Sequence, residues 1–598
     1  MMKKLLMGNE AIALGAIKAG VNVVCGYPGT PSTEVLETVA KNNDGSIYVE
    51  WSVNEKSAME LGAGACYAGA RVMVTMKQVG LNVASDPLMS LAYIGTNGGM
   101  VILVADDPGP ISSQTEQDTR HFAKYSNLPV LDPSTPEEAY EMVQYAFELS
   151  ERFKLPVFLR PTTRVCHACS TIDIDETKTE HKPCGFAKSP EWVIFPALSC
   201  RKHGEIEKKQ LELSDIFSDI KFNSANGSGK AVAASGVSYT YVKEVIGNYK
   251  LDIKLLKLGA AYPFPSKLAL EFLSGQNEVL VIEELDPVIE DSLIHLCGQH
   301  NINAKILGKA SGSLPYNGEY TYDIVKNAIL AYMGMPAEQT AAKTAEVLLP
   351  VRPPVLCAGC PHRASFYAVK TALKGKKAVF SGDIGCYTLG NASQLEMVDT
   401  CLCMGAGITI AQGLQRVDTD TLHLAFIGDS TFFHTGIPGV INAVYNNTKI
   451  TVVILDNSTT AMTGHQPHPG TGKTMMGGIS EKIDIEAVLK AIGVSCVVKA
   501  DPLDLKQAQN AIRTATQYEG VSAVIYKSPC IALFKSGKKA VISDKCIGCK
   551  KCVKELGCPA IAYIDGKAEI DSSLCCGCGL CAQVCPAVAI DVEEEYAG

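Results

Sequence analysis

The sequence lacks an apolar run of the length that a bilayer requires, about 20 residues, so no membrane-spanning helix is expected. It also lacks a long basic run, and its formal net charge is -9, so no nucleic-acid-binding surface is expected. Asn9 and Glu10 interrupt the first apolar stretch, which argues against the core of a signal peptide. We therefore expect a cytoplasmic protein that works away from membranes and nucleic acids.

The 598 residues include 47% apolar and 20% charged side chains, which is typical of a globular protein with several domains. Apolar strands alternate with helical stretches over most of the chain, which predicts a multidomain α/β fold with doubly wound parallel sheets. The expected parts are an α/β domain (1–170), a linker region (171–230), a second α/β domain (231–345), a third α/β domain (346–535) and a cysteine-rich α+β domain (536–598).

The first informative stretch extends from His423 to Asn457. Two apolar runs flank a helical segment, which predicts a βαβ unit with Asp429 and Asn457 at the ends of neighbouring parallel strands. Carboxylate and amide oxygens suit Mg²⁺ that also holds a diphosphate. The spacing Gly428-Asp429-Ser430, 26 residues and then Asn resembles the diphosphate signature of thiamine diphosphate enzymes, although Ser430 replaces the usual glycine. The alternative is an ordinary turn at the end of a strand.

Small residues elsewhere in this domain would allow a ligand to approach the backbone closely. Gly385 and Cys386 end one strand, and Gly405 opens a helix rich in small residues; together with Gly428 we assign them to cofactor binding. His465 is a weak candidate for a general acid or base.

Glu55 opens a small-residue-rich helix in the first domain. One interpretation is a capping box with Ser52, which would satisfy free backbone amides at the helix start. The other is catalytic: a carboxylate hydrogen-bonded to N1′ of the thiamine pyrimidine helps its 4′-amino group to take the C2 proton. Because the diphosphate signature is also present, we favour the catalytic role.

Other cysteines and an arginine leave alternatives open. Arg120 is either a solvated charge or a bidentate clamp for a substrate carboxylate. Cys166 and Cys169 resemble half a zinc site without a second pair, so free thiols are preferred. Cys357 and Cys360 form a lone C-x₂-C pair, which we interpret as structural or weakly redox-active.

The C-terminal tail carries the most specific pattern. Two runs, each ending in Cys-Pro, have the arrangement of bacterial two-cluster ferredoxins. In that arrangement the fourth ligand of each cube comes from the other run. The expected [4Fe-4S] ligand sets are Cys546, Cys549, Cys552 and Cys585 for one cluster, and Cys575, Cys578, Cys581 and Cys558 for the other. Asp565-Gly566 is expected to be a hairpin turn between the runs, Cys576 to be a spacer, and zinc knuckles to be the weaker alternative.

A thiamine site fused to a ferredoxin-like tail indicates that electrons leave the active site singly. The consistent chemistry is oxidative decarboxylation of a 2-oxo acid, with coenzyme A as the acyl acceptor. A non-oxidative lyase and an electron-transfer protein with a vestigial thiamine site are the alternatives.

Several blocks carry a resemblance over nearly the whole chain: YPGTPSTEV, WSVNEKSAMELGAGACYAGAR, KQVGLNVASDP, RPPVLCAGCPHRASF, GDIGCYTLG, GDSTFFHTGIPGVINAVYN, DNSTTAMTGHQPHPG and the cysteine tail. They resemble the large subunits of indolepyruvate ferredoxin oxidoreductases, a branch of the 2-oxoacid:ferredoxin oxidoreductases. The resemblance implies aryl pyruvate substrates, ferredoxin as acceptor, and a small beta subunit in a dimer of alpha–beta pairs. Pyruvate or a branched-chain 2-oxo acid is the alternative substrate.

The same resemblance implies that residues 1–170 form the pyrimidine-side thiamine diphosphate domain, 231–345 a transketolase C-terminal-like domain, 346–535 the diphosphate-side domain, which binds the diphosphate and Mg²⁺, and 536–598 a two-cluster ferredoxin domain. It also implies roles for individual residues. Glu55 matches the cofactor-activating glutamate, and Asp429, Asn457 and Thr459 match the magnesium positions, Thr459 through its backbone carbonyl. By looser similarity to pyruvate-oxidising relatives, Thr30 and Arg120 would face the substrate carboxylate.

Overall fold

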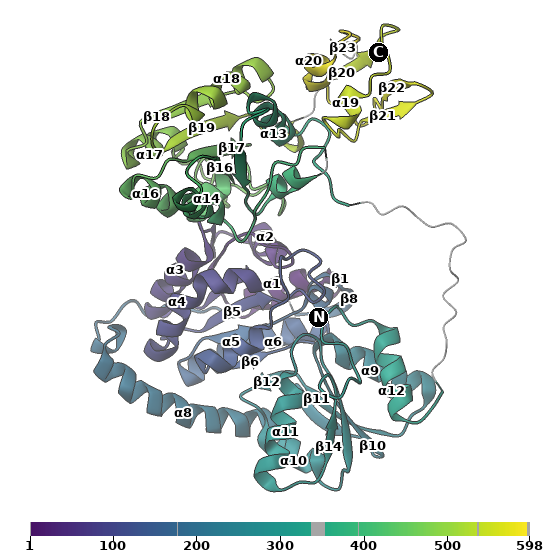
Figure 1. Cartoon of the computed structure of the whole chain (residues 1–598). Helices are drawn as coiled ribbons and strands as arrows, with labels where there is room; N and C mark the ends of the chain where they lie inside the picture. The colour runs from purple at the N-terminus through teal and green to yellow at the C-terminus, as the bar shows by residue number, and fades with distance from the viewer. Residues whose placement is uncertain (1, 176, 337–352, 393, 535–536, 595–598) are drawn as a thin grey trace. The chain divides into compact units, whose positions relative to one another are not determined.

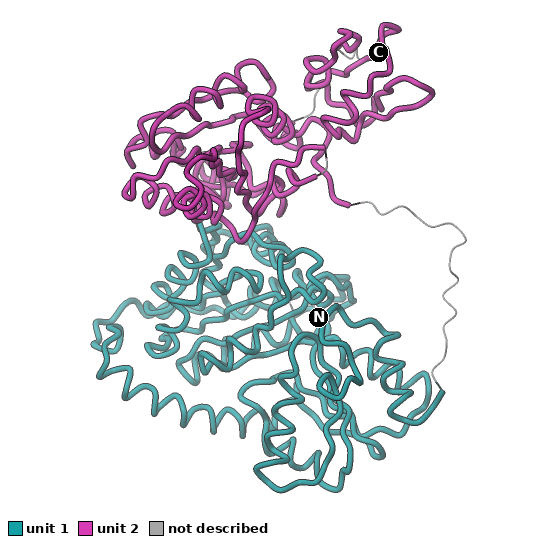
Figure 2. Tube along the Cα trace, viewed as in Figure 1, with its two compact units in different colours: residues 1–344 teal, residues 345–598 magenta. Residues whose placement is uncertain are grey.

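The computed structural model describes residues 2–175, 177–336, 353–392, 394–534 and 537–594. The chain divides into two compact units, residues 1–344 and 345–598 (Figure 2). The expected domain boundaries near 345 and 535 fall at residues outside the described set. Within the described residues, none of the helices combines the length and the apolarity needed to span a bilayer.

The first unit contains a seven-stranded sheet in the order β12-β6-β7-β5-β4-β2-β3 (Figure 1). Its neighbouring strands are parallel except for β12, which pairs antiparallel with β6. The strands are β2 (Val23–Gly26), β3 (Tyr48–Trp51), β4 (Val72–Lys77), β5 (Met100–Ala105), β6 (Val130–Leu131), β7 (Val157–Leu159) and β12 (Ala260–Tyr262). The helices of this part are α1 (Gly8–Lys18), α2 (Thr33–Lys41), α3 (Glu55–Tyr67), α4 (Gln78–Ile94), α5 (Thr119–Ser126), α6 (Pro136–Phe153) and α7 (Thr163–His167).

A five-stranded sheet in the order β14-β13-β10-β11-β9 follows in the same unit. Its strands are β9 (Asn223–Asn226), β10 (Lys230–Ser235), β11 (Ile253–Leu258), β13 (Glu278–Ile282) and β14 (Lys305–Leu307). Its helices are α9 (Gly236–Tyr249), α10 (Ser266–Leu273), α11 (Val288–His300) and α12 (Tyr322–Tyr332). The expected linker region (171–230) contains the 24-residue helix α8 (Pro196–Asp219) and the edge strand β9. The predicted domain boundary at residue 170 falls within β8 (Cys169–Ile174), which pairs with β1 (Met2–Met7) of the first domain.

The second unit contains a wholly parallel five-stranded sheet in the order β15-β16-β17-β19-β18. Its strands are β15 (Ala378–Ser381), β16 (Leu422–Gly428), β17 (Thr451–Asp456), β18 (Cys496–Ala500) and β19 (Ser522–Lys527). Its helices are α13 (Pro361–Ala372), α14 (Ala406–Val417), α16 (Ile437–Tyr445), α17 (Ile485–Ile492) and α18 (Leu505–Thr516). The βαβ unit predicted from the sequence is confirmed, because β16 and β17 are parallel neighbours joined through α16.

The cysteine-rich tail forms two antiparallel pairs, β20 (Lys538–Ile542) with β23 (Ile590–Glu594) and β21 (Ile561–Ile564) with β22 (Lys567–Ile570). The predicted turn at Asp565-Gly566 joins β21 to β22, and the short helices α19 (Lys551–Lys554) and α20 (Leu580–Val584) follow the cysteine loops. One apolar core contains residues of both the parallel sheet and the tail, among them Phe366, Phe426, Leu556 and Leu580. The tail therefore shares its packing with the diphosphate-side domain.

Candidate thiamine diphosphate and iron–sulfur sites

Asp429 lies directly after β16 and is 2% exposed. Its Oδ1 accepts a hydrogen bond from the backbone amide of Ser430 (2.9 Å), and its Oδ2 accepts one from that of Ser458 (2.7 Å). The Nε2 atom of His468 also lies 3.0 Å from Oδ2. Burial raises the pKa of this carboxyl, and the interaction with His468 opposes that rise. The side chain is therefore held in one orientation at the carboxyl end of the sheet.

The expected magnesium ligands come together at this edge. The side-chain oxygen of Asn457 lies 2.8 Å from the carbonyl oxygen of Thr459 and 3.3 Å from Oδ1 of Asp429. The nearest donor, the Thr459 amide, is 3.4 Å away. With its amide reversed, Asn457 would donate hydrogen bonds to both of these oxygens; with its oxygen turned toward them, the three atoms form a set of ligands that a cation would satisfy. Neighbouring ligands of an octahedral Mg²⁺ are about 3 Å apart, so the donor set and its spacing fit this ion.

The glycines assigned to cofactor binding are required by neighbouring protein side chains. A Cβ atom would lie 2.2 Å from the Tyr387 ring at Gly428, 2.5 Å from the same ring at Gly385, and 2.2 Å from Oγ1 of Thr435 at Gly405. The hydroxyl of Tyr387 lies 2.6 Å from Oγ1 of Thr431, in the segment after Asp429. These small residues let Tyr387 and Thr435 pack against the strand ends.

Two buried histidines near this edge were not found by sequence reasoning. His465, the predicted candidate, is exposed, whereas His468 is buried against Asp429. His362 is buried with its Nε2 atom 3.3 Å from Nδ2 of Asn457, and burial lowers its pKa to about 4. The only sequence signal for His362 was its position after Pro361 and the C-x₂-C motif, and this spacing does not predict that Asn457 is its partner.

Glu55 begins α3 and is 5% exposed. The alternative interpretation, a capping box with Ser52, is wrong: the cap is Asn54, whose side chain accepts a hydrogen bond from the Ser57 amide, while Ser52 donates to Glu50. The carboxylate of Glu55 packs on α4, where a Cβ atom at Gly80 would lie 2.5 Å from its Oε1. A capping requirement therefore does not explain this glutamate.

Lys77, at the end of β4, is a neighbouring charge that sequence reasoning missed. Burial lowers the pKa of its ammonium, and the negative charges of Glu55 and Asp107 oppose that shift. Glu55 thus lies in a partly desolvated, charge-balanced part of the first unit.

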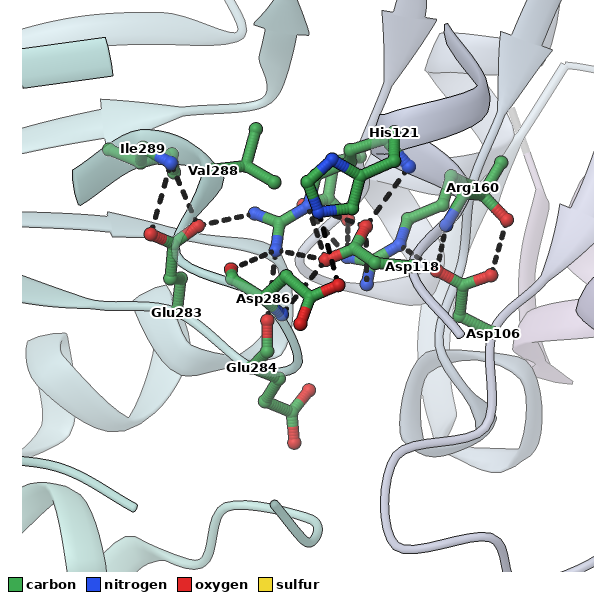
Figure 3. Close-up of polar contacts among 12 residues, drawn as sticks. Asp106, Asp118, His121, Arg160, Glu283, Glu284, Asp286, Val288 and Ile289 are labelled. Atoms are coloured by element: carbon green, nitrogen blue, oxygen red, sulfur yellow. Dashed lines mark hydrogen bonds and ion pairs between the residues drawn. The ribbon is translucent and has the colours of Figure 1, made fainter. Parts of the chain in front are cut away.

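Arg120 is fully buried among carboxylates, which corrects the expectation of an exposed clamp or a solvated charge. Its partners Asp118 and Glu283 are labelled in Figure 3. Its side chain is 0% exposed; Nη2 lies 2.6 Å from Oδ2 of Asp118 and Nη1 lies 2.6 Å from Oε2 of Glu283. Arg160 continues the ionic network through Asp106 (2.7 Å). A buried arginine with these partners ties α5 to the segment after β13, and removing one partner would leave an uncompensated buried charge.

Thr30, the other expected substrate residue, lies in the loop between β2 and α2 and is partly exposed. Its carbonyl accepts a 3.3 Å hydrogen bond from Oγ of Ser112. Since Arg120 is enclosed, the two residues do not form an exposed carboxylate-binding pair.

The same network yields a test of stability against pH. Burial raises the pKa of Glu284 to about 7, although the Tyr320 amide donates to it at 2.9 Å and the charge of Arg160 lowers it. Below about pH 4.5 the Glu284 carboxyl is protonated in both the folded and the unfolded chain, so it does not reduce the free energy of unfolding. Between about pH 4.5 and 7 the folded chain keeps this proton while the unfolded chain loses it, so the free energy of unfolding falls as the pH rises. Glu284→Gln should therefore raise the unfolding free energy of the first unit by roughly 3 kcal/mol at pH 8, and by less than about 1 kcal/mol at pH 5.

Thermal unfolding of the full chain at the two pH values measures this effect. Glu271→Gln, at an exposed position in α10, is the matched control and should change neither melt. Equal stabilisation by Glu284→Gln at pH 5 and pH 8 would contradict the explanation from a buried charge.

The structure brings the tail cysteines together in the two crossed sets expected from the sequence. One cavity is lined by Cys546, Cys549, Cys552 and Cys585. A second is lined by Cys558, Cys575, Cys578 and Cys581, together with Cys360, Cys576 and Arg363. Within the described part of the chain, no three His, Cys, Asp or Glu side chains are placed to hold a single metal ion, and each set encloses a volume instead. A cube binds one thiolate per iron, so four thiols around a cavity fit it.

Cys558 and Cys576 provide a matched pair of tests. If Cys558 is a ligand and Cys576 a spacer, Cys558→Ser should lose up to about four iron atoms per chain, whereas Cys576→Ser should keep all of them. Iron and sulfide analysis of anaerobically purified protein measures this. Iron loss from Cys576→Ser alone would exchange the two assignments, since both residues line the same cavity.

The C-x₂-C pair of the diphosphate-side domain is not isolated, which corrects the interpretation as a lone pair. Burial and the nearby thiols of Cys530 and Cys357 raise the pKa of the Cys386 thiol to about 11, and burial and the nearby Cys386 thiol raise the pKa of the Cys360 thiol to about 12. The Cys530 amide donates to the Asn457 carbonyl at 2.9 Å, so this group of four thiols adjoins the magnesium-type site. Cys386 and Cys530 come from separate loops with no paired spacing, and the sequence therefore gave no signal for the group.

Comparison with protein families agrees with both sites. Residues 14–205 match the thiamine diphosphate-binding family of pyruvate flavodoxin/ferredoxin oxidoreductases, residues 383–526 match the C-terminal TPP-binding domain of thiamine pyrophosphate enzymes, and residues 538–591 match a 4Fe-4S dicluster domain. The fold and sites thus define a thiamine diphosphate-dependent 2-oxoacid ferredoxin oxidoreductase.

Full-length relatives narrow the class. The chain is 42% identical to the indolepyruvate oxidoreductase subunit IorA of Methanothermobacter thermautotrophicus, covering 99% of this chain and 98% of the relative, and 42% identical to that of Thermococcus kodakarensis, covering 99% and 97%. The 2-oxoglutarate synthase subunit KorA of Methanocaldococcus jannaschii is 26% identical over 45% of this chain. The chain belongs to the IorA family, the alpha subunits of indolepyruvate ferredoxin oxidoreductases.

Proposed function

We propose that this chain oxidises aryl pyruvates such as indolepyruvate, together with a small beta subunit in a dimer of alpha–beta pairs. The balanced reaction converts one 2-oxo acid, one coenzyme A and two oxidised ferredoxins into one acyl-CoA, one CO₂, two reduced ferredoxins and a proton. The observation that carries the proposal is that one compact unit contains three converging oxygens at a diphosphate-type strand end and two four-thiol cavities.

Thiamine diphosphate, when bound, supplies the electron sink for decarboxylation. In the proposal, Asp429, Asn457 and the Thr459 carbonyl hold Mg²⁺, and His468 keeps the Asp429 carboxylate oriented. Because Asp429 is buried, the attraction of its carboxylate for a bound cation would be less screened by solvent. Glu55 accepts the hydrogen bond from the pyrimidine that activates the cofactor, and its buried position favours a persistent bond.

The electron path runs through the second unit. The four-thiol group formed by Cys357, Cys360, Cys386 and Cys530 adjoins Asn457 at one side, and Cys360 also lines the Cys558 cavity. We include this group as a third iron–sulfur site between the thiamine side and the two tail clusters. Cys386→Ser should then lose up to about four iron atoms per chain with the tail clusters intact, whereas Cys496→Ser, outside the group, should lose none. Unchanged iron in Cys386→Ser would remove the third site from the proposal.

The function is tested with the alpha–beta enzyme purified anaerobically and supplied with coenzyme A, ferredoxin or viologen, and a panel of 2-oxo acids. We expect the highest kcat/KM with indolepyruvate, and CO₂ release that requires the electron acceptor. A higher kcat/KM with pyruvate or a branched-chain acid would replace the substrate, and full CO₂ release without an acceptor would indicate a lyase.

A further inference from the structure

Arg363 is a buried cation that joins the two parts of the second unit. It lies in α13 and is 4% exposed. Its Nη1 atom donates to the carbonyls of Leu556 (2.5 Å) and Gly557 (2.8 Å), immediately before Cys558. Its Nη2 atom donates to the carbonyl of Leu356 (2.5 Å). The guanidinium therefore fastens two cysteine loops that are distant in sequence.

The Nε atom of Arg363 has a different environment. It is buried, and it has no hydrogen-bond partner among the residues that the structure describes. A buried guanidinium N–H without an acceptor is costly, and such groups normally have a partner. Arg363 lines the same cavity as Cys558, Cys578, Cys581 and Cys360. The free donor thus belongs to a side chain at the rim of a four-thiol cavity.

We infer that Arg363 is a positioning residue for electron transfer: its Nε–H donates to a sulfur of the cluster in the Cys558 cavity and raises the reduction potential of that cluster. This inference rests on the proposed function, which places a [4Fe-4S] cluster there. Reduction adds a negative charge, and a nearby buried cation and an N–H···S bond both favour the reduced state.

The other tail cavity lacks an equivalent environment among its described lining residues. Its cation is Lys550, which is only partly buried and has its Nζ atom 4.1 Å from the centre of the Tyr563 ring. A partly solvated charge is screened by water, so its effect on a cluster is weaker. Arg363 therefore makes the two tail clusters unequal, and the cluster adjoining the thiol group of the diphosphate-side domain becomes the easier one to reduce.

Pulsed EPR of the dithionite-reduced alpha–beta holoenzyme, with ¹⁵N-labelled arginine, detects the contact directly. We expect a ¹⁵N hyperfine coupling to a reduced cluster that disappears in Arg363→Lys and in Cys558→Ser. The other described arginines of this unit, Arg416 and Arg513, are both exposed. No ¹⁵N coupling in a holoenzyme with both tail clusters reduced would overturn the inference, whether or not any variant folds.

EPR-monitored redox titration measures the consequence. Arg363→Gln should move the midpoint potential of one cluster to a lower value, Arg363→Lys should move it less, and Arg513→Gln should not move it; the cluster of the Cys546 set serves as the internal control. Full iron content with unmoved potentials in Arg363→Gln would show that the side chain only fastens the loops, which overturns the inference. Absence of all cluster signals would instead overturn the proposed function on which it rests.

Discussion

Replacing Glu55 with glutamine is expected to lower kcat for 2-oxo acid oxidation by about 10²–10⁴-fold, the range that a positioned acid–base group supplies. Glutamine keeps the size of the side chain, which packs against Gly80, but removes the carboxylate that the cofactor pyrimidine requires. The binding of thiamine diphosphate should change much less than kcat, because the diphosphate is held by other residues. Single-turnover assays with indolepyruvate and viologen measure the loss.

Glu60→Gln is the matched control for Glu55→Gln. Glu60 lies in the same helix, its side chain is 51% exposed, and it forms an ion pair with Lys56 at the surface. This variant should retain nearly full activity and iron content. If Glu55→Gln keeps more than half of the wild-type kcat, Glu55 has no part in activating the cofactor, and the proposed reaction would need another carboxylate.

The second large effect is expected from Asp429→Asn. An amide has one oxygen and no charge, so the variant would lack the anionic ligand that the proposal assigns to Mg²⁺, and it would also lose an acceptor for the Ser458 amide and His468. We expect the Kd for thiamine diphosphate in the presence of Mg²⁺ to rise about 100-fold or more. Titration calorimetry under anaerobic conditions measures it, and added Mg²⁺ should restore part of the binding.

Asp418→Asn is the control for this variant, because Asp418 precedes the same strand but forms a surface ion pair with Lys377. Its Kd for the cofactor should equal that of the wild type. An unchanged Kd in Asp429→Asn would contradict the magnesium site. The site would then be a turn in which the reversed Asn457 amide donates hydrogen bonds to Asp429 and to the Thr459 carbonyl.

Local patterns predicted the parts of this protein whose geometry depends on neighbouring residues in the sequence. The βαβ unit around Asp429 and the hairpin at Asp565-Gly566 depend on short-range periodicity and turn chemistry, and both were found. The crossed cysteine sets follow from the spacing of the two runs, and each set lines one cavity.

Long-range features were not predictable in the same way. Arg120 was assigned to a substrate carboxylate by looser similarity to pyruvate-oxidising relatives, but it is buried, and its partner Glu283 lies 163 residues further along the chain. The short strand β12 completes the first sheet from a distant segment, and three residues give no usable period. The partnership of His468 with Asp429 likewise depends on how the loop after Asn457 folds back, which the sequence does not encode in any local pattern.

The apolar core shared by the parallel sheet and the cysteine-rich tail has a mechanical consequence. A ferredoxin-like domain on a flexible linker could move between an electron donor and an acceptor. In this chain, Leu556 and Leu580 of the tail share one apolar core with Phe426 of β16, so the tail is held in place. In the proposed reaction, ferredoxin would therefore have to dock on a fixed surface of the tail. Oxidative loss of a cluster would also weaken the packing between the tail and the diphosphate-side domain. Exposure to air would therefore lower the stability of the second unit as well as stop electron transfer.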